Sequence, residues 1–266
     1  LKVAGLIYPE KRMDINGKVI AITGGGRGIG RSIAISLAAK GAKLALLDLD
    51  EAAMDETVSL INEAGSEAKG YICNVSDEET VVATFTQIVA DFGTIEGLVN
   101  NAGILRDGQL IKVKDGKVVK KMSADHFSLV VDVHMKGAFL CAREAASHMV
   151  EQGVEEGCIV NMSSGAFRGN FGQSNYSAAK AGIVAMSRVW SKELAKFNIR
   201  SMAIAPGTIE TDLLRTMPAE ALKNLANMVP LGRIGDVSNI SLTVTHILEN
   251  DYLSGDVIDV NGGMFL

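Results

Sequence analysis

Tyr176 and Lys180 are spaced for acid–base chemistry. Residues four positions apart share one face of a helix, so a lysine ammonium would lie one turn away from a tyrosine phenol. A positive charge at that distance favours the phenolate and lowers a tyrosine pKa from its ordinary value of about 10 toward neutrality. A tyrosine tuned in this way can act as a general acid toward a carbonyl oxygen. Taken alone, such a pair is common by chance and ordinarily lies on a surface.

A glycine-rich segment, Thr23 to Gly30, follows a short apolar run and opens an amphipathic stretch. Gly24 permits a tight turn, Gly28 lets the backbone approach a pyrophosphate, and Gly30 lets a helix pack against a strand. The free N–H groups of the first helical turn would face the anion. A glycine-rich loop alone is a weak signal, but the strand before it and the helix after it indicate a dinucleotide site.

Asp48 ends the next apolar run. A carboxylate there can accept hydrogen bonds from the adenosine ribose hydroxyls and would repel a 2′-phosphate, which favours NAD(H) over NADP(H). Asp48 could instead cap a helix, although Asp50 is better placed for that. Arg27 could contact a 2′-phosphate, but it cannot remove the carboxylate of Asp48. The sequence therefore predicts NAD as the cofactor.

The elements that must position these residues alternate along the chain. Apolar runs rich in β-branched residues are separated by stretches of helical period, which is typical of βαβ units. We predict an α/β chain with a doubly wound Rossmann fold, in which helices cover both faces of a seven-stranded parallel sheet. The expected strands are Val19 to Thr23, Leu44 to Asp48, Gly70 to Cys73, Gly97 to Asn100, Cys158 to Ser163, Arg200 to Ala205 and Val257 to Val260.

No linker or repeat divides the chain, so we expect a single domain over residues 13–266. Residues 1–12 precede the first methionine and the fold pattern, and we expect them to be an extension or a cloning remnant. Residues 111–121 interrupt the alternation. Their apolar and basic side chains alternate about Asp115-Gly116, which predicts an inserted β-hairpin that projects from the domain.

Composition and charge exclude several classes of protein. The chain has 26 basic and 31 acidic side chains and a net charge of −5, whereas nucleic-acid-binding proteins carry a basic face. Cys73, Cys141 and Cys158 form no CxxC pair, so neither a disulfide framework nor a metal site is expected. No apolar run approaches the roughly 18 residues of a membrane span. We expect a cytoplasmic protein with no nucleic-acid or membrane partner.

The motifs together resemble the short-chain dehydrogenase/reductase family over residues 15–266. Beside the glycine loop and the Tyr176/Lys180 pair, the matching segments are Asn100-Asn101-Ala102-Gly103, Pro206-Gly207-Thr208-Ile209-Glu210-Thr211 and Ser254-Gly255 with Asn261-Gly262-Gly263. Their type, order and spacing agree with that family. The resemblance implies that Tyr176 exchanges a proton with the substrate oxygen, Lys180 binds the nicotinamide ribose and lowers the tyrosine pKa, and a serine holds the oxygen.

The resemblance also implies how the cofactor is held. Asn101, Ala102 and Gly103 would pass beside the adenine ribose, and Asn74 would lie next to the adenine. With the glycine loop and Asp48, the expected cofactor-binding residues are Gly24, Arg27, Gly28, Ile29, Gly30, Asp48, Asn74, Val75, Asn101, Ala102, Gly103, Tyr176, Lys180, Pro206, Gly207, Ile209 and Thr211.

Two serines compete for the catalytic role. Ser163 stands 13 positions before Tyr176, the usual family spacing, whereas Ser164 is the second of the pair, which is often the active one. A loop one residue shorter would favour Ser164. We predict Ser163, because rigid elements on both sides make spacing the firmer guide.

His134 departs from the family pattern. Most members have an asparagine there, which supports a water chain that feeds protons to the lysine and tyrosine, and some acyl-CoA-directed relatives carry histidine. The titration range of histidine suits a relay, so we include His134 among the catalytic residues. The alternative is a histidine that fills space between helix and sheet.

Residues 211–230 resemble the substrate-covering lid of the family. Apolar side chains recur there at helical spacing, which implies a substrate with apolar bulk. They are Leu213, Leu214, Met217, Leu222, Leu225 and Met228.

The segment from Gly169 to Gly182 is most similar to 3-oxoacyl-acyl-carrier-protein reductases and (3R)-hydroxyacyl-CoA dehydrogenases. We predict an NAD-dependent oxidoreductase of fatty acid metabolism that acts on a 3-hydroxyacyl or 3-oxoacyl thioester. The alternatives are a dehydrogenase of cyclic, aromatic or steroid alcohols and a non-catalytic dinucleotide-binding sensor. The resemblance implies a homotetramer. The five hairpin lysines could attract an acyl carrier, although a charge run is ordinarily a solvated face.

Overall fold

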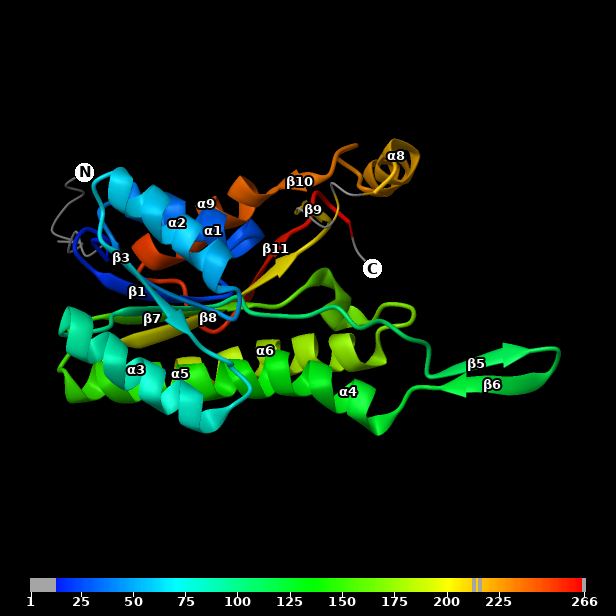
Figure 1. Ribbon diagram of the computed structural model, residues 1–266, viewed down its shortest axis with the longest axis horizontal. Coiled ribbons are helices and arrows are strands. Elements are labelled where there is room, and N and C mark those ends of the chain that lie inside the picture. Colours follow the sequence, from blue (N-terminus) through cyan, green and yellow to red (C-terminus); the bar gives the residue numbers. More distant parts are fainter. Residues whose placement is uncertain (1–12, 212–213, 215–216, 265–266) are drawn as a thin grey trace, which may run out of the picture.

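A seven-stranded parallel sheet forms the centre of the computed structural model, which describes residues 13–211, 214 and 217–264 (Figure 1). The strand order is β11-β8-β7-β4-β1-β2-β3, which confirms the predicted doubly wound fold. Each strand begins and ends within two residues of its predicted limits. The strands are β1 (Val19–Thr23), β2 (Lys43–Asp48), β3 (Ala68–Ile72), β4 (Gly97–Asn100), β7 (Gly157–Met162), β8 (Ile199–Pro206) and β11 (Val257–Val260).

The central strands β1, β4 and β7 are buried along their whole length. A parallel sheet is covered on both faces, which explains why these strands are nearly continuous apolar runs. Within β1, Ile20 and Ile22 join the core on one face, while Val19 and Ala21 join the core on the other. This alternation is the period-two pattern of a strand between two helical layers.

Helices cover both faces of the sheet (Figure 1). One layer contains α1 (Gly28–Ala38), α2 (Glu51–Glu63) and α9 (Val237–Glu249). The opposite layer contains α3 (Glu78–Phe92), α4 (Ala124–Val131), α5 (Gly137–Glu151) and α6 (Ser174–Glu193). Among the described residues, no helix is both long and apolar enough to cross a membrane.

The order of the strands creates the binding edge. The chain runs outward from β1 through β2 to β3, then returns to β4 on the other side of β1. At such a reversal the loops that leave neighbouring strands diverge and open a crevice at the carboxyl ends. The glycine loop after β1 and the loop after β4 flank this crevice.

Two inserted segments extend from the sheet on the same side (Figure 1). Where the sequence predicts a hairpin, β5 (Ile111–Lys114) and β6 (Lys117–Lys121) pair antiparallel. Asp115 and Gly116 both have positive φ, 50° and 72°, as a two-residue hairpin turn requires. The second segment contains α8 (Ala219–Met228) and belongs to the predicted lid, of which residues 212–213 and 215–216 lie outside the described residues. The predicted extension, residues 1–12, lies outside them too.

Short irregular elements complete the described chain. A π-helical turn, η1 (Asp132–Lys136), joins α4 to α5, and a 3₁₀ turn, η2 (Gly165–Arg168), follows β7. The others are η3 (Ala195–Phe197), β9 (Ile209–Glu210) and β10 (Gly235–Asp236). Widened turns of the π type are frequent at functional sites, and η1 carries His134.

Candidate active site

Lys180 lies at the bottom of the site on α6, with its side chain buried. Its Nζ donates a hydrogen bond of 2.6 Å to the carbonyl oxygen of Met162, at the end of β7. The same Nζ lies 5.5 Å from the centroid of the Tyr176 ring, so the pair shares one face of α6. Burial lowers the pKa of Lys180 to about 7, because no carboxylate compensates for the loss of water.

The pKa of Tyr176 differs from the expectation based on Lys180. Burial disfavours the phenolate and raises this pKa above its ordinary value, and a hydrogen bond from the Ser164 hydroxyl opposes the shift without cancelling it. Lys180 lies over the ring and bonds to a carbonyl, so its ammonium is not directed at the phenol oxygen. The expected lowering of the tyrosine pKa by Lys180 is therefore wrong for this arrangement.

The serine next to the phenol is Ser164, which corrects the choice of Ser163. Ser163 is buried, and its Oγ donates a 2.9 Å hydrogen bond to the backbone oxygen of Lys180. Ser164 stands at the start of η2, accepts a hydrogen bond from the amide of Ala166, and reaches the Tyr176 hydroxyl. Adjacent residues of an extended backbone point to opposite sides, so only one of the two serines can face the crevice.

His134 contacts both the tyrosine and the loop after β4. Its ring meets the ring of Tyr176 edge-on, at 5.2 Å between centroids and 88° between planes. Its Nε2 lies 3.0 Å from the amide nitrogen and 2.8 Å from the carbonyl oxygen of Ile104. Burial, followed by the charge of Lys180, lowers the pKa of His134 to about 3. The imidazole is therefore neutral at physiological pH, so a relay based on its ordinary titration range is not supported.

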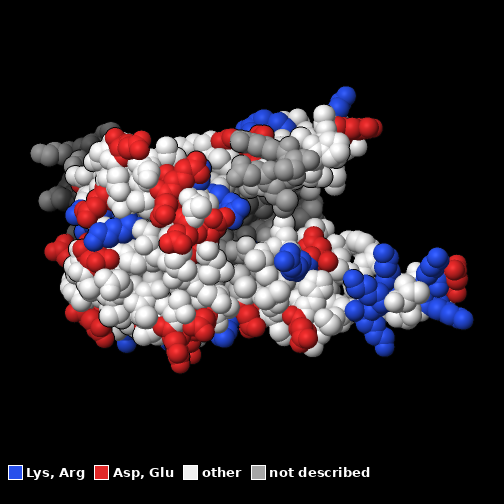
Figure 2. Space-filling model, in the orientation of Figure 1, with Lys and Arg blue, Asp and Glu red and all other residues white. Residues whose placement is uncertain are grey.

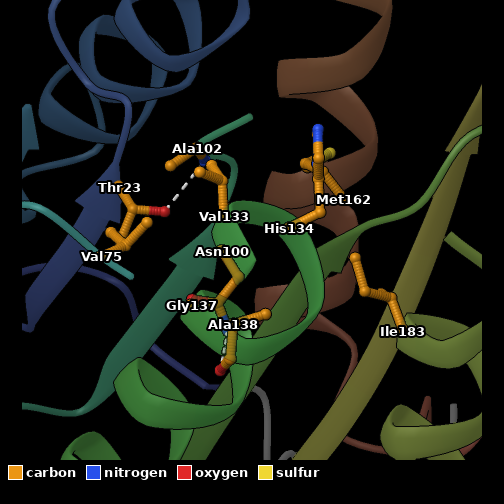
Figure 3. A pocket seen from close by; sticks show the side chains of 10 residues that line it. All are labelled: Thr23, Val75, Asn100, Ala102, Val133, His134, Gly137, Ala138, Met162 and Ile183. Carbon is orange, nitrogen blue, oxygen red and sulfur yellow. Dashed lines mark hydrogen bonds between the residues drawn. The ribbon is translucent and has the colours of Figure 1, made fainter. Parts of the chain in front are cut away.

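A small cavity lies beside His134, between the loop after β4 and the first turn of α5 (Figure 3). Asn100 reaches it from β4, and its Nδ2 donates to Ala138 and Asn161. Among the described residues, Oδ1 of Asn100 and Nδ1 of His134 are buried without a hydrogen-bond partner. Buried polar atoms of this kind ordinarily bind an ordered water when they share a cavity.

The glycine loop has the geometry that a pyrophosphate needs. Gly24 and Gly28 have φ values of 64° and 54°, which other residues rarely adopt. A Cβ at Gly30 would lie 1.9 Å from the carbonyl oxygen of Gly24, so the helix can approach the turn only with glycine there. No side chain caps the amino terminus of α1, and its first turn holds no acidic residue. Its N–H groups are thus available to an anion, which fits a dinucleotide.

Asp48 lies at the end of β2, next to the glycine loop. Its Oδ2 accepts a 2.9 Å hydrogen bond from the amide of Gly26, and its Oδ1 accepts from the amides of Leu49 and Asp50. Asp50 caps α2 through the amide of Ala53, so the capping role does not fall to Asp48. The guanidinium of Arg27 forms an ion pair with Asp50.

The remaining predicted cofactor residues lie along the same carboxyl edge. The hydroxyl of Thr23 accepts hydrogen bonds of 3.0 Å from the amides of Asn101 and Ala102, which fixes the loop after β4 against the end of β1. A Cβ at Gly103 would lie 2.2 Å from Cε1 of His134. The others follow neighbouring strands: Asn74 and Val75 come after β3, Pro206 ends β8, Gly207 bonds to Val260, and Ile209 and Thr211 follow.

Sequence reasoning did not single out three residues that organise the site. Thr23 ties two loops together, and the carbonyl of Met162 orients Lys180. Asn175 is fully buried and donates to the carbonyl oxygens of Arg106 and His126. The position of Asn175 directly before Tyr176 was the one sequence feature that could have drawn attention to it. Its hydrogen-bond partners lie far away in the sequence and are brought to it by the tertiary structure.

These groups can exchange a proton with the oxygen of a carbonyl or an alcohol. Two hydroxyls, those of Tyr176 and Ser164, can address one substrate oxygen, and Lys180 lies beside them. The crevice that accommodates a dinucleotide opens at the same edge. Among the described residues, no group of three or more His, Cys, Asp and Glu could hold a metal ion.

Comparisons with known proteins agree with this geometry. A family model described as enoyl-(acyl carrier protein) reductase matches residues 24–265. The 3-oxoacyl-[acyl-carrier-protein] reductase FabG of Thermotoga maritima is 34% identical, over 96% of this chain and 100% of its own. A human 3-oxoacyl-[acyl-carrier-protein] reductase is 36% identical, over 94% of this chain and 98% of its own.

Two solved structures are similar over the same extent. An NAD+-bound xylitol dehydrogenase matches with a TM-score of 0.84 and 31% identity, over 94% of this chain and 99% of its own. A levodione reductase matches with a TM-score of 0.83 and 34% identity, over 94% and 98% respectively.

Proposed function

The chain belongs to the short-chain dehydrogenase/reductase family, and from that premise we propose that it interconverts 3-oxoacyl and 3-hydroxyacyl thioesters. The relatives named as 3-oxoacyl-[acyl-carrier-protein] reductases support this substrate class, because this chain matches them over nearly their whole length. Its main structural support is the buried phenol of Tyr176, with Nζ of Lys180 5.5 Å from the ring centroid and the Ser164 hydroxyl acting on the phenol oxygen.

The chain's own residues handle the substrate oxygen. When bound, a nicotinamide cofactor would provide the hydride chemistry at C3. The phenol of Tyr176 donates its proton to the C3 oxygen during reduction, and its raised pKa keeps that proton available at neutral pH. The Ser164 hydroxyl donates a hydrogen bond to the same oxygen as negative charge develops there. His134 stays neutral and holds the Ile104 backbone beside the tyrosine ring.

NAD is the cofactor we propose. We expect a 2′-phosphate to approach the carboxylate of Asp48, whose neighbour Leu49 is 66% exposed and brings no positive charge. Arg27, the nearest cation of the glycine loop, is paired with Asp50. A 2′-phosphate would meet repulsion without compensation.

A homotetramer in the cytoplasm is the assembly and location we propose. Exposed apolar side chains, Phe139 and Val150 on α5 and Phe197 on η3, line a groove that also contains Trp190 of α6. Apolar patches of this kind ordinarily mark an interface with another subunit. The cysteines at 73, 141 and 158 are free and buried, which suits a reducing compartment.

A second candidate, reduction of a cyclic ketone or oxidation of a polyol, is favoured by the names of the two structural neighbours. A substrate panel distinguishes the candidates. We expect acetoacetyl-CoA and a 3-oxoacyl N-acetylcysteamine thioester to be reduced with NADH at higher kcat/KM than cyclohexanone. Higher kcat/KM for the cyclic ketone would contradict the proposed substrate. Tyr176→Phe should abolish turnover while cofactor binding, measured by NADH fluorescence, is retained.

A further inference from the structure

The hairpin formed by residues 111–121, here called the basic arm, is not explained by the chemistry of the site. Every residue of β5 and β6 is exposed, and the two strands project away from the helical layers (Figure 1). A two-stranded hairpin on its own is marginally stable in water. Its side chains are all available to a binding partner.

The cross-strand register sorts the basic arm into two faces. Lys112 lies opposite Lys120, and Lys114 lies opposite Lys117, with a register shift between Lys112 and Val113. Residues directly opposite one another project to the same side, so each pair brings two ammonium groups together. Val113 lies opposite Val118 on the other face. Like charges directly opposite one another destabilise a hairpin. An anionic surface bound against that face would attract the lysines and offset the repulsion between them.

The charge of the basic arm contrasts with that of the rest of the chain. Five lysines stand against one aspartate within residues 111–121, whereas the whole chain carries a net charge of −5. Figure 2 shows the basic side chains gathered over β5 and β6, apart from the acidic side chains that dominate the body in this view. The basic arm is therefore a distinct cationic surface on an acidic protein.

The base of the basic arm is fastened to the residues that precede Tyr176. The amide of Gly108 donates to the carbonyl oxygen of Gly172 at 2.7 Å, and Nε2 of Gln173 donates to Asp107 at 2.9 Å. Asn175 donates to Arg106, before the basic arm, and to His126, after it. The basic arm thus rises from the rim of the active site on a fixed base.

Exposed apolar side chains lie at the same base. Leu110 is 70% exposed directly before β5, and Phe171 is 84% exposed beside Gly172, which bonds to Gly108. Strands of four and five residues, with a rise of ~3.4 Å per residue, carry the lysines over about 15 Å. A lysine row of that length next to apolar side chains offers charge complementarity to an extended acidic surface.

We propose that the basic arm docks an acidic acyl carrier protein, whose thioester then enters the site beside Tyr176. This inference rests on the proposed function, because it requires a 3-oxoacyl group that is delivered as a carrier thioester. Attraction between the lysine face and acidic side chains would increase the association rate and lower KM without changing the chemistry at C3.

A charge-neutralised variant tests the docking surface. The variant combines Lys112→Gln, Lys114→Gln, Lys117→Gln and Lys120→Gln, and its matched control carries arginine at the same four positions. Both are assayed with one 3-oxoacyl group attached to acyl carrier protein, to coenzyme A and to N-acetylcysteamine, which is short and uncharged. We expect kcat/KM with the carrier protein to fall roughly tenfold through KM in the glutamine variant and to be retained in the arginine control.

Ionic strength provides a second measurement. For the unmodified protein, kcat/KM with the carrier protein should fall as salt screens the attraction, and the glutamine variant should lose this dependence. Turnover of the N-acetylcysteamine thioester should be the same in all three proteins, which also shows that the variants fold.

The outcomes separate this inference from the proposed function. If the N-acetylcysteamine thioester is reduced but KM for the carrier protein is the same in all three proteins, the docking proposal alone fails. An equally large loss with the coenzyme A thioester would assign the basic arm to a nucleotide and overturn a protein partner. If no 3-oxoacyl thioester is reduced while other ketones are, the proposed function itself fails.

Discussion

The two adjacent serines permit a matched test of the site, because Ser163→Ala and Ser164→Ala remove the same atom from neighbouring positions. The Ser164 hydroxyl reaches the phenol of Tyr176 and faces the crevice. The Ser163 hydroxyl donates its hydrogen bond to the backbone oxygen of Lys180. Ser164→Ala should therefore reduce catalysis, and Ser163→Ala should reduce stability.

The expected magnitudes differ enough to be decisive. Removal of one hydrogen-bond donor from a developing oxyanion costs roughly 100-fold in kcat, equivalent to about 2.7 kcal/mol of transition-state stabilisation. Ser163→Ala removes one buried neutral hydrogen bond, which costs about 1 kcal/mol of the free energy of unfolding. That loss lowers Tm by roughly 2–4 °C in a protein of this size.

Steady-state reduction of a 3-oxoacyl thioester and thermal unfolding should be measured on both variants and on Ser164→Thr, which keeps a hydroxyl. We expect Ser164→Ala to lose kcat with little change in KM for NADH, and Ser164→Thr to recover part of it. Ser163→Ala should stay within a few-fold of the unmodified kcat. A larger catalytic loss from Ser163→Ala than from Ser164→Ala would refute the assignment drawn from the geometry.

Further predictions concern the cofactor, the buried histidine and the direction of the reaction. Asp48→Ala should raise kcat/KM with NADPH relative to NADH by roughly tenfold or more, as measured with one ketone, because the repulsion of a 2′-phosphate is removed. Gly103→Ala places a Cβ 2.2 Å from Cε1 of His134, so it should cost roughly 1–3 kcal/mol of unfolding free energy, and the double change with His134→Ala should cost less than the sum. His134 has a folded pKa of about 3 and an ordinary value of 6.5, so the unfolded chain binds the extra proton and stability falls as pH drops below 6.5. Between pH 7 and pH 5, the free energy of unfolding measured with denaturant should fall by about 2 kcal/mol less in His134→Asn than in the unmodified protein. An equal fall in the two proteins would contradict a neutral buried imidazole. Because the pKa of Tyr176 is raised, alcohol oxidation should require higher pH than ketone reduction, and coincident pH profiles would contradict this.

The fold was predictable because it depends on local signals. The apolar runs predict the first and last residues of β1 and β4. The glycine at position 24 predicts a tight turn, and Gly24 has the positive φ of that turn. Asp115-Gly116 likewise specifies its own turn. The capping role could be assigned to Asp50 and not to Asp48, because a helix cap has a fixed position relative to the helix that follows.

The errors arose where tertiary structure decides. Spacing favoured Ser163, but the 3₁₀ turn η2 begins directly after Ser164, and the side chain of Ser164 caps that turn. The charge states of His134 and Tyr176 depend on how completely other elements enclose them, and a sequence does not state enclosure. The partners of Asn175 come from segments far away in the chain, so the role of that residue could not be inferred from its neighbours.

One physical cause, burial, sets the protonation of all three titratable groups around the reacting oxygen. It raises the pKa of Tyr176, lowers that of Lys180 to about 7, and lowers that of His134 to about 3. Each shift favours the neutral form, so the site near neutral pH holds a protonated phenol and a neutral imidazole. Reduction consumes a proton at the substrate oxygen, and a protonated phenol is the state that delivers it. Oxidation requires the phenolate, which burial disfavours. The enclosure that orders the site therefore also biases it toward reduction of the ketone.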